Sequence, residues 1–370
     1  MKRWLCVLLA ALSLLLAACG SAAPTDVKES TAAMELVYAE NFAVEYLPDG
    51  AALLTLGGKD RYVLLNEGAE APKTYAALPQ ISVPVEDIYL ASSSVADLLL
   101  QMGALDAARY TSTKAESWTL PEVTAAMEEG SLLYAGKYSA PDYELLLTEG
   151  CGLVVENTMI LHNPATKEKL EALGLPVMIE YSSYEPHPLG RVEWIKLYGL
   201  LTGHLAEATA FFDRQAETFR TVTETEKSGK TVAFFHITAN GSVVVRKRAD
   251  YVTRMIELAG GETALTELPA DDTALSTVNM QMEAFYAQAR DADVLIYNST
   301  VAGDVKTVEQ LLAQSALLAD FKAVQSGNVW CTEQSMFQRS SAAADMIADI
   351  HNILSDSPEE STLKFLHRIN

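Results

Sequence analysis

Short apolar segments separated by turn residues open the part of the chain that we expect to fold. Phe42–Tyr46 and Ala52–Leu56 lie on either side of a Pro-Asp-Gly sequence at residues 48–50, and Tyr62–Leu65 follows them. Apolar strands flanking turn-forming residues in this way are typical of hairpins. We therefore predict a β-hairpin with a third strand within residues 35–66.

From residue 87 onward, apolar strands alternate with helical stretches. Glycines close several of the helices, among them Gly103 and Gly174. Such alternation favours parallel sheets with helices on both faces. The expected strands cover residues 87–91, 153–156, 176–181, 231–237, 293–297 and 328–331, and the expected helices cover residues 95–102, 165–173, 249–258 and 308–318.

Two segments of the chain repeat the same order of features. In residues 143–157 and again in residues 282–298, a helix begins near a glutamate, a buried strand follows, and an asparagine ends the strand. The spacing from Glu144 to Asn157 is 13 residues, and that from Glu283 to Asn298 is 15. We infer two similar α/β lobes of Rossmann-like fold.

The stretch between the two lobes is predicted to be helical. Gly203 divides it, and residues 204–225 contain many helix formers and neither Gly nor Pro. A helix of that length is about 30 Å long, so we expect one long backbone helix to join the lobes stiffly. The expected parts are a first lobe at 34–188, connecting helices at 189–226, a second lobe at 227–356 and a C-terminal tail at 357–370.

The first 19 residues are predicted to be a lipoprotein signal peptide. Lys2 and Arg3 precede an apolar run that ends in Leu-Ala-Ala-Cys-Gly at residues 16–20. Cleavage before Cys19 would leave a cysteine that carries acyl chains and anchors the protein on the extracytoplasmic face of the cell membrane. The alternative is an ordinary signal peptide with a chance cysteine. Residues 20–33 are small and polar and are expected to form a flexible tether.

The charge of the chain argues against nucleic acid as a partner. The formal net charge is −22, and loss of Lys2 and Arg3 with the signal makes it −24, with 25 basic against 49 acidic residues. Such a surface repels phosphate backbones. The net charge of the whole chain does not determine the local charge of a ligand-binding cleft.

The cysteines and histidines predict neither a disulfide nor a metal site. Once the signal is removed and Cys19 is lipidated, Cys151 and Cys331 remain, in different halves of the chain. We interpret them as two buried free thiols. No Cys-x-x-Cys pair occurs and the six histidines are scattered, so no metal-binding spacing is found.

Several further segments carry a resemblance to a known family. They are Met-Gly-Ala-Leu-Asp at 102–106, Leu-Glu-Ala-Leu-Gly-Leu-Pro-Val at 170–177, His-Pro-Leu-Gly-Arg-Val-Glu-Trp-Ile-Lys at 187–196 and Ile-Glu-Leu-Ala-Gly-Gly at 256–261. With the lipobox, the paired glutamate segments and the connecting helix, residues 40–355 resemble the helical-backbone class of solute-binding proteins of ABC importers. One departure is Gly-Cys-Gly at 150–152, where the family often has Lys-Pro-Asp.

The resemblance implies a function and a set of partners. Proteins of this class carry iron-siderophores, haem or cobalamin in the cleft between their lobes and deliver them to an ABC permease and its ATPase. We expect a monomer without a cofactor of its own that binds a small molecule, most favourably a ferric siderophore or another iron complex; haem and a corrinoid stay open. An exposed glutamate on each lobe contacts the permease in this family, and Glu144 and Glu283 match by position. Their alternative role is to begin helices as solvated residues.

The ligand is expected where strand ends of both lobes face the cleft. From the first lobe this predicts Ser92, Ser93, Asn157, Tyr184, Glu185 and His187. From the second lobe it predicts Arg246, Lys247, Arg248, Asn298, Trp330 and Gln338, the last in a loop at 333–340 that could fold over the cleft. The alternatives are helix capping for the serines, a solvated loop for the basic triplet and core packing for Trp330.

The sequence also bears on structural roles and on other classes of protein. Arg191 and Glu193 are interpreted as structural, with Arg191 holding the loop before the connecting helices through carboxylates, and His187 is disfavoured as a metal ligand. An enzyme is not favoured, because the sequence has no GxSxG, HExxH, P-loop or dinucleotide-binding motif. A surface adhesin or a cofactor-holding lipoprotein is the remaining alternative, and the paired glutamates argue against it.

Overall fold

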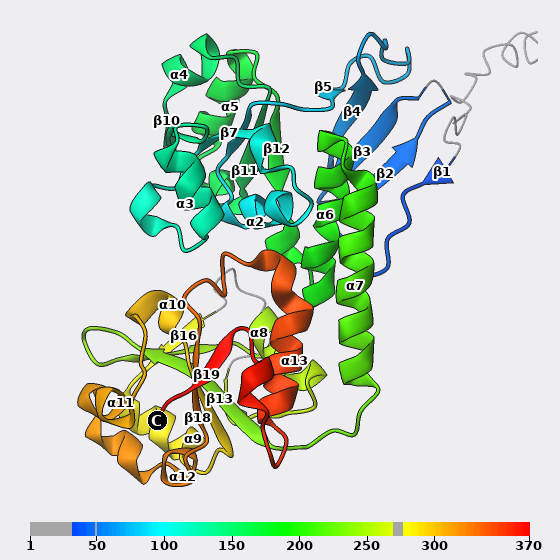
Figure 1. Cartoon of the computed structure of the whole chain (residues 1–370). Helices are drawn as coiled ribbons and strands as arrows, with labels where there is room; N and C mark the ends of the chain where they lie inside the picture. The colour runs from blue at the N-terminus through cyan, green and yellow to red at the C-terminus, as the bar shows by residue number, and fades with distance from the viewer. Residues whose placement is uncertain (1–31, 49, 269–276) are drawn as a thin grey trace, which may run out of the picture.

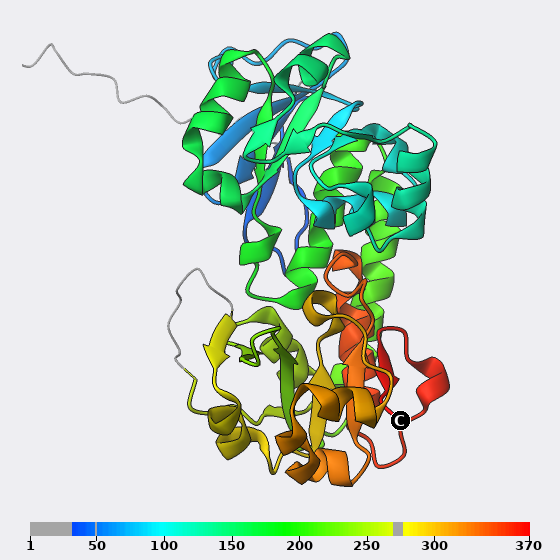
Figure 2. The same cartoon turned by 90° about the vertical axis from the view of Figure 1, so that its left-hand side faces the viewer.

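The structure is a computed structural model that describes residues 32–48, 50–268 and 277–370. Two lobes are stacked one above the other, and a pair of helices runs along one side of both (Figures 1 and 2). The predicted signal peptide with Cys19, and most of the predicted tether, lie outside the described residues.

A five-stranded sheet precedes the first lobe and packs beside the helix pair (Figure 1). Its strands follow the chain order β1-β2-β3-β4-β5, and the predicted hairpin and third strand are confirmed as β2, β3 and β4. The ring of Phe42 on β2 lies 5.1 Å from that of Trp194, which joins this sheet to the connecting helices. The strands are β1 (Ala32–Ala33), β2 (Phe42–Tyr46), β3 (Ala52–Leu56), β4 (Asp60–Asn66) and β5 (Gln80–Val83).

The first lobe contains a parallel sheet of order β12-β11-β6-β7-β8, as the alternating pattern predicts. Its strands are β6 (Ile88–Leu90), β7 (Ala108–Thr111), β8 (Leu133–Tyr134), β11 (Leu153–Asn157) and β12 (Val177–Glu180). A small hairpin is formed by β9 (Gly136–Lys137) and β10 (Ala140–Pro141). Its helices are α2 (Ser93–Gln101), α3 (Pro121–Glu128), α4 (Tyr143–Thr148) and α5 (Pro164–Ala172), with 3₁₀ turns at Thr158–His162 and Ser182–Tyr184.

The second lobe contains a mixed sheet of order β16-β14-β13-β17-β18-β19, with β15 paired to β13. Strands β13, β17 and β18 are parallel, whereas β14, β16 and β19 run antiparallel to their neighbours. The strands are β13 (Thr231–Ile237), β14 (Val243–Arg246), β15 (Glu262–Thr263), β16 (Thr277–Met280), β17 (Val294–Tyr297), β18 (Val329–Thr332) and β19 (Leu366–Arg368). The helices are α8 (Tyr251–Leu258), α9 (Met282–Ala289), α10 (Ser299–Ala302), α11 (Val308–Gln314), α12 (Lys322–Gln325) and α13 (Ala343–Ile353).

The C-terminal segment corrects one prediction. Residues 357–370 were expected to form a tail outside the lobe, but β19 pairs with β18 and belongs to the second sheet. The reason is apolar burial, because Leu366 and Ile369 are 3% and 1% exposed.

Two helices divided at Gly203 occupy the connection, as the sequence predicts. Helix α6 (Pro188–Thr202) ends at Gly203, whose φ of 79° suits glycine, and α7 (Leu205–Thr223) packs against it and leads the chain into the second lobe. A Cβ on Gly199 would come 2.5 Å from the Cβ of Ala208, so a side chain there would force the helices apart. The predicted long helix is therefore α7, braced by α6.

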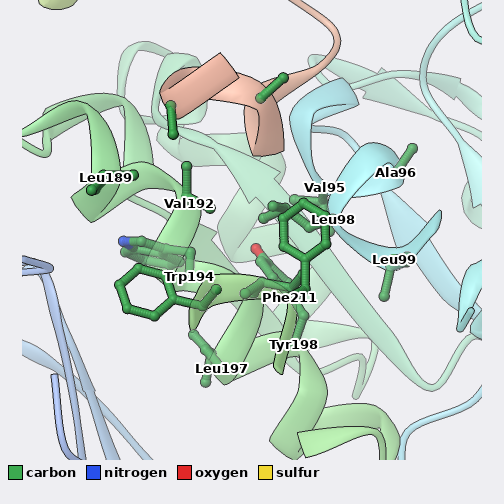
Figure 3. Close-up of a cluster of buried hydrophobic side chains, with 14 of the residues drawn as sticks. Val95, Ala96, Leu98, Leu99, Leu189, Val192, Trp194, Leu197, Tyr198 and Phe211 are labelled. Carbon is green, nitrogen blue, oxygen red and sulfur yellow. The ribbon is translucent and has the colours of Figure 1, made fainter. Parts of the chain in front are cut away.

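A single apolar cluster joins the lobes. It contains side chains of α2, α6 and α7 and continues into α8, α13 and one face of the second sheet, the face that carries Phe234 and Trp330. Figure 3 shows its centre, where side chains of α2, α6 and α7 meet. Large apolar side chains each contribute about 1.5–3 kcal/mol when fully buried. The relative position of the lobes is therefore held by core packing. The side chains labelled in Figure 3 are Val95, Ala96, Leu98, Leu99, Leu189, Val192, Trp194, Leu197, Tyr198 and Phe211.

Candidate functional site

A cleft between the two lobes is the candidate ligand site. It encloses about 910 Å³ of empty space, solvent at its mouth included. That volume suits a small organic ligand or cofactor. The lining residues come from three strand ends and the start of α2 in the first lobe, from α6, and from α8, α13, the loop before α13 and the residue before β19 in the second lobe: Ser92, Ser94, Asn157, Thr158, Met159, Glu180, Ser182, Ser183, Arg191, Tyr251, Met255, Met336, Phe337, Arg339, Ser340, Ala342, Ala343, Met346 and Phe365.

Polar side chains at strand ends form the first-lobe wall. Ser92 follows β6, Asn157 ends β11 and Glu180 ends β12, and these neighbouring parallel strands end at one edge of the sheet. The Ser92 hydroxyl is 2.8 Å from that of Ser94. The Asn157 amide donates to the carbonyl of Ala91 at 2.9 Å. This wall is already hydrogen-bonded to the protein and presents a fixed surface.

Flexible apolar side chains form the second-lobe wall. Met255, Met336 and Met346 line it beside the rings of Phe337 and Phe365. Methionine is unbranched and polarizable, and its sulfur makes favourable contacts with aromatic rings. This wall can adapt to the shape of an apolar or aromatic ligand.

Two arginines bring positive charge to the cleft. The Arg191 guanidinium lies 3.8 Å from the ring centre of Tyr251, and one of its terminal nitrogens donates to the carbonyl of Ser183 at 2.7 Å. Its Nε is buried and has no hydrogen-bond partner among the described residues. Arg339 approaches Asp97 at 3.8 Å, a distance that leaves donors of its guanidinium free for a ligand.

A buried carboxyl group lies beside Arg191. The Glu180 side chain accepts a hydrogen bond from the amide of Ser182 at 2.9 Å. Burial raises the pKa of Glu180, although the hydrogen bonds from Ser182 and the charge of Arg191 act in the opposite direction. A raised pKa favours the neutral form of the carboxyl, so burial lowers its repulsion of an anion relative to an exposed glutamate.

The loop before α13 crosses from the second lobe to the first. Gln338 accepts from the Thr119 amide at 2.8 Å and donates to the Ser117 carbonyl at 2.7 Å. The amide of Ser341 donates to Asp97 at 2.9 Å. The loop that the sequence placed near the cleft thus bridges the lobes at one side of the cleft.

Comparison with known proteins decides the family. The family model described as periplasmic binding protein matches residues 88–335, which is more than half of the chain. This chain belongs to the periplasmic binding protein family.

One relative is similar to this chain in sequence, and several solved structures share its fold. An uncharacterized lipoprotein of Methanocaldococcus jannaschii is 26% identical over 315 residues, which are 81% of this chain and 77% of the relative. A periplasmic haem-binding protein of Pseudomonas aeruginosa has a TM-score of 0.57 at 16% identity, covering 77% of this chain and 98% of its own. A protein of an ABC-type Fe³⁺-hydroxamate transport system from Saccharomonospora viridis has a TM-score of 0.55 at 18% identity, covering 74% and 94%.

Membership of the periplasmic binding protein family confirms the resemblance seen in the sequence. The family is extracytoplasmic and binds solutes without catalysing a reaction, so the protein is not an enzyme, as predicted. Among the described residues, no helix is both long enough and apolar enough to cross a membrane. Cys151 and Cys331 are buried free thiols, as expected.

Among the predicted ligand residues, Ser92 and Asn157 line the cleft. Ser93 instead begins α2 beside the lining residues Ser92 and Ser94. Gln338 bridges the lobes as described above. The glutamate–asparagine repeat has a physical basis as well, because Asn157 and Asn298 each accept a hydrogen bond from the amide two residues later and begin a helical turn.

Three predicted ligand residues are corrected because they are buried in the protein. Trp330 is fully buried, and its indole nitrogen donates to Asn328 at 2.8 Å. Glu185 is 3% exposed, and its carboxylate accepts from the amides of Glu40 and Asn41 and from the Trp194 indole. Asn298 is 1% exposed in the second lobe. None of the three reaches the cleft surface.

The basic triplet of the second lobe is also placed differently. Arg246 pairs with Asp250 at 3.7 Å and lies 4.7 Å from the ring centre of Phe337, so it supports the cleft from behind that ring. Lys247 is buried and Arg248 is exposed, and neither is among the lining residues. Tyr184 is 55% exposed outside the lining. The cationic groups of the cleft are Arg191 and Arg339 instead.

The residues interpreted as structural have clear partners. The Glu193 carboxylate accepts from the amides of Val37, Tyr38 and Ala39 and pairs with Lys196 at 2.8 Å. Arg191 holds the loop before α6 through a carbonyl, not through carboxylates as expected, and it also lines the cleft. His187 accepts from the Leu189 amide, and burial lowers the pKa of its imidazole to about 4, which keeps it neutral.

Glu144 and Glu283 are exposed near the start of α4 and α9, one on each lobe. In Figure 1, α4 lies toward the far end of the first lobe and α9 toward the far end of the second. This placement is compatible with two widely separated contacts to one partner.

Proposed function

We propose that this protein is the substrate-binding component of an ABC importer and that it carries an anionic iron complex with an aromatic or apolar organic part. A lipid on Cys19 would hold it on the extracytoplasmic face of the membrane. Haem and ferric catecholate siderophores belong to this ligand class. The fold neighbours that bind haem or transport ferric hydroxamate support the choice of an iron complex.

The observation that carries the proposal is the buried, unpartnered Nε of Arg191 at the edge of a methionine-rich wall. A buried donor without a partner is costly, and a ligand oxygen would satisfy it. Charge-assisted hydrogen bonds to carboxylate or phenolate oxygens are the strong ones. The methionines and rings opposite would cover the organic part of the same ligand.

A binding panel tests the ligand class. Protein lacking residues 1–19 is titrated with haemin, a ferric catecholate, a ferric hydroxamate and cyanocobalamin, and the shift in melting temperature is measured. We expect the anionic aromatic complexes to give the largest shifts. Binding of cyanocobalamin alone would contradict the anionic class while leaving the importer role intact.

Substitution of the arginines tests the site. Arg191→Gln and Arg339→Gln are each expected to weaken binding about 10-fold to 100-fold, because a hydrogen bond to a charged group contributes about 1.5–3 kcal/mol. Arg248→Gln is the matched control, since Arg248 is an exposed arginine of the second lobe outside the cleft lining. Equal affinity of all three variants and the wild type would place the ligand elsewhere.

The two exposed glutamates are proposed to orient the protein on the permease. Anions on separate lobes fix the geometry of docking more than its strength. Double substitution of Glu144 and Glu283 by alanine is expected to abolish uptake and leave ligand affinity unchanged. Loss of affinity in the double variant would show that these residues act in the cleft or in folding.

A further inference from the structure

Three potential metal ligands from separate segments meet at the edge of the second sheet, away from the cleft lining. Cys331 on β18 and His367 on β19 are direct partners in the antiparallel ladder, and these strands lie side by side in Figure 1. Asp304 joins them from the segment after α10. The thiol, one imidazole nitrogen and one carboxylate oxygen all lie within 4.8 Å of one another.

The distances match those between ligands of a tetrahedral metal ion. The Cys331 Sγ is 3.6 Å from Oδ1 of Asp304, and Nε2 of His367 is 3.2 Å from the same oxygen. Tetrahedral Zn²⁺ holds thiolate, imidazole and carboxylate at about 2.0–2.3 Å, which puts neighbouring ligand atoms about 3.3–3.6 Å apart. Two of the three separations therefore suit one tetrahedral ion, and the third, between Sγ of Cys331 and Nε2 of His367, is within 4.8 Å.

The imidazole is oriented as a metal-bound histidine usually is. Nδ1 of His367 lies 3.1 Å from Oε1 of Glu333, so a proton on Nδ1 would be donated to that carboxylate. Nε2 then keeps its lone pair; it is buried and makes no hydrogen bond of good geometry among the described residues. A carboxylate behind the ring is the common support of a metal-binding histidine.

The other oxygen of the aspartate points to a different partner. Oδ2 of Asp304 lies 3.5 Å from Nζ of Lys306, which leaves Oδ1 for the ion. Binding would replace the thiol proton by the metal and release that proton to solvent.

We propose that Asp304, Cys331 and His367 bind one Zn²⁺-type divalent ion, with a fourth position open to water. A mixed thiolate, imidazole and carboxylate set is typical of zinc among the divalent metals. The ion would fasten the last strand and the segment after α10 to the second sheet. The site differs from the ligand cleft and does not depend on the proposed function.

Cobalt titration tests the site directly. The purified full chain is dialysed against chelator and titrated with Co²⁺, whose thiolate complexes show an intense ligand-to-metal charge-transfer band in the near ultraviolet. We expect the band at one ion per chain and its loss in Cys331→Ser. Cys151→Ser is the matched control, because Cys151 is also a buried free thiol but has no such cluster, and it should keep the band.

Two further variants keep the test decisive if Cys331→Ser fails to fold. His367→Gln changes a partly exposed residue and should lower the affinity for Zn²⁺, measured by competition with a chelator, at least 10-fold. Glu333→Gln, which acts through the histidine, should weaken it about 10-fold to 100-fold and leave the cobalt band in place. Absence of the band in the wild type, or its persistence in Cys331→Ser, would overturn the proposal, as would unchanged affinity in His367→Gln.

Discussion

The two walls of the cleft are built in different ways. The first-lobe wall consists mainly of short polar side chains at strand ends, and those of Ser92 and Asn157 are hydrogen-bonded within the protein; Met159 is an apolar member of this wall. The second-lobe wall consists of methionines, rings and Arg339, carried by helices and a loop. The comparison indicates a fixed polar surface that sets ligand orientation and an adaptable apolar surface that follows ligand shape.

The largest expected effect is on stability, at the buried carboxylate of Glu193 that holds residues 37–39 against α6. Glu193→Ala removes the acceptor of three backbone amides and leaves the buried Lys196 ammonium without its carboxylate, with only the carbonyl of Glu35 as a hydrogen-bond acceptor among the described residues. We expect the free energy of unfolding to fall by about 3–5 kcal/mol, measured by urea denaturation. Glu217→Ala, which breaks an exposed pair with Arg220 on α7, is the control and should change nothing measurable. Equal stability of both variants would show that the buried Glu193 carboxylate contributes no more to stability than an exposed ion pair does.

The second prediction compares the pH dependence of the lobes. Burial raises the pKa of Glu156 on β11 to about 8, and burial raises that of Asp349 on α13 to about 6. Both carboxyls are stabilised in their protonated form, so their contribution is complete below the unfolded-state pKa and is lost as pH rises through the folded-state value.

Stability should therefore fall between about pH 4.5 and pH 8 because of Glu156, and over a narrower range, up to about pH 6, because of Asp349. The midpoints of urea denaturation across this pH range measure the fall in stability. Glu156→Gln should flatten the plot of urea midpoint against pH above pH 6, whereas Asp349→Asn should not. A curve above pH 6 that is unaffected by Glu156→Gln would show that this carboxyl is ionised in the folded protein.

The third prediction concerns the contact between the walls. Asp97→Ala leaves the buried amide of Ser341 without its acceptor and removes the partner of Arg339. We expect a loss of about 1–3 kcal/mol of unfolding free energy. Asp106→Ala, at a more exposed position shortly after the same helix, is the control. A result no different from the control would mean that the loop before α13 is held without this contact.

The smallest effect is expected in the adaptable wall. Met336→Leu conserves volume and should cost less than about 1.5 kcal/mol of stability, with only a small change in ligand affinity. Ser92→Val, in the fixed wall, should reduce affinity more, because it also removes the hydroxyl beside Ser94 and Glu180. Calorimetric titration of both variants measures the difference. A larger loss of affinity in Met336→Leu than in Ser92→Val would contradict the view that the first-lobe wall is fixed and the second-lobe wall is adaptable.

Much of the fold could be predicted because its signals are local. The strands at 42–46 and 52–56 and the long helix α7 follow from apolar spacing and from helix formers, and the structure confirms them. The C-terminal strand β19 could not be read this way, since its pairing with β18 depends on a segment more than thirty residues earlier in the chain.

The cleft was predicted well only where one rule applies. Parallel strands end at the same edge, which located Ser92 and Asn157. In the second lobe the same rule pointed to Asn298 and Trp330, which are buried; Trp330 belongs to the apolar cluster that joins the lobes. Arg191 was assigned a structural role, and only its burial against Tyr251 reveals its place in the cleft.

The shared core of the lobes has a consequence for cooperativity. Because one apolar cluster runs from the N-terminal sheet through α6 and α7 to α13, we expect loss of packing in one half to destabilise the other. The protein should melt in a single calorimetric transition, and separately expressed halves should aggregate. Movement of the lobes relative to each other would have to disturb this core, so we expect little hinge motion when a ligand enters or leaves the cleft.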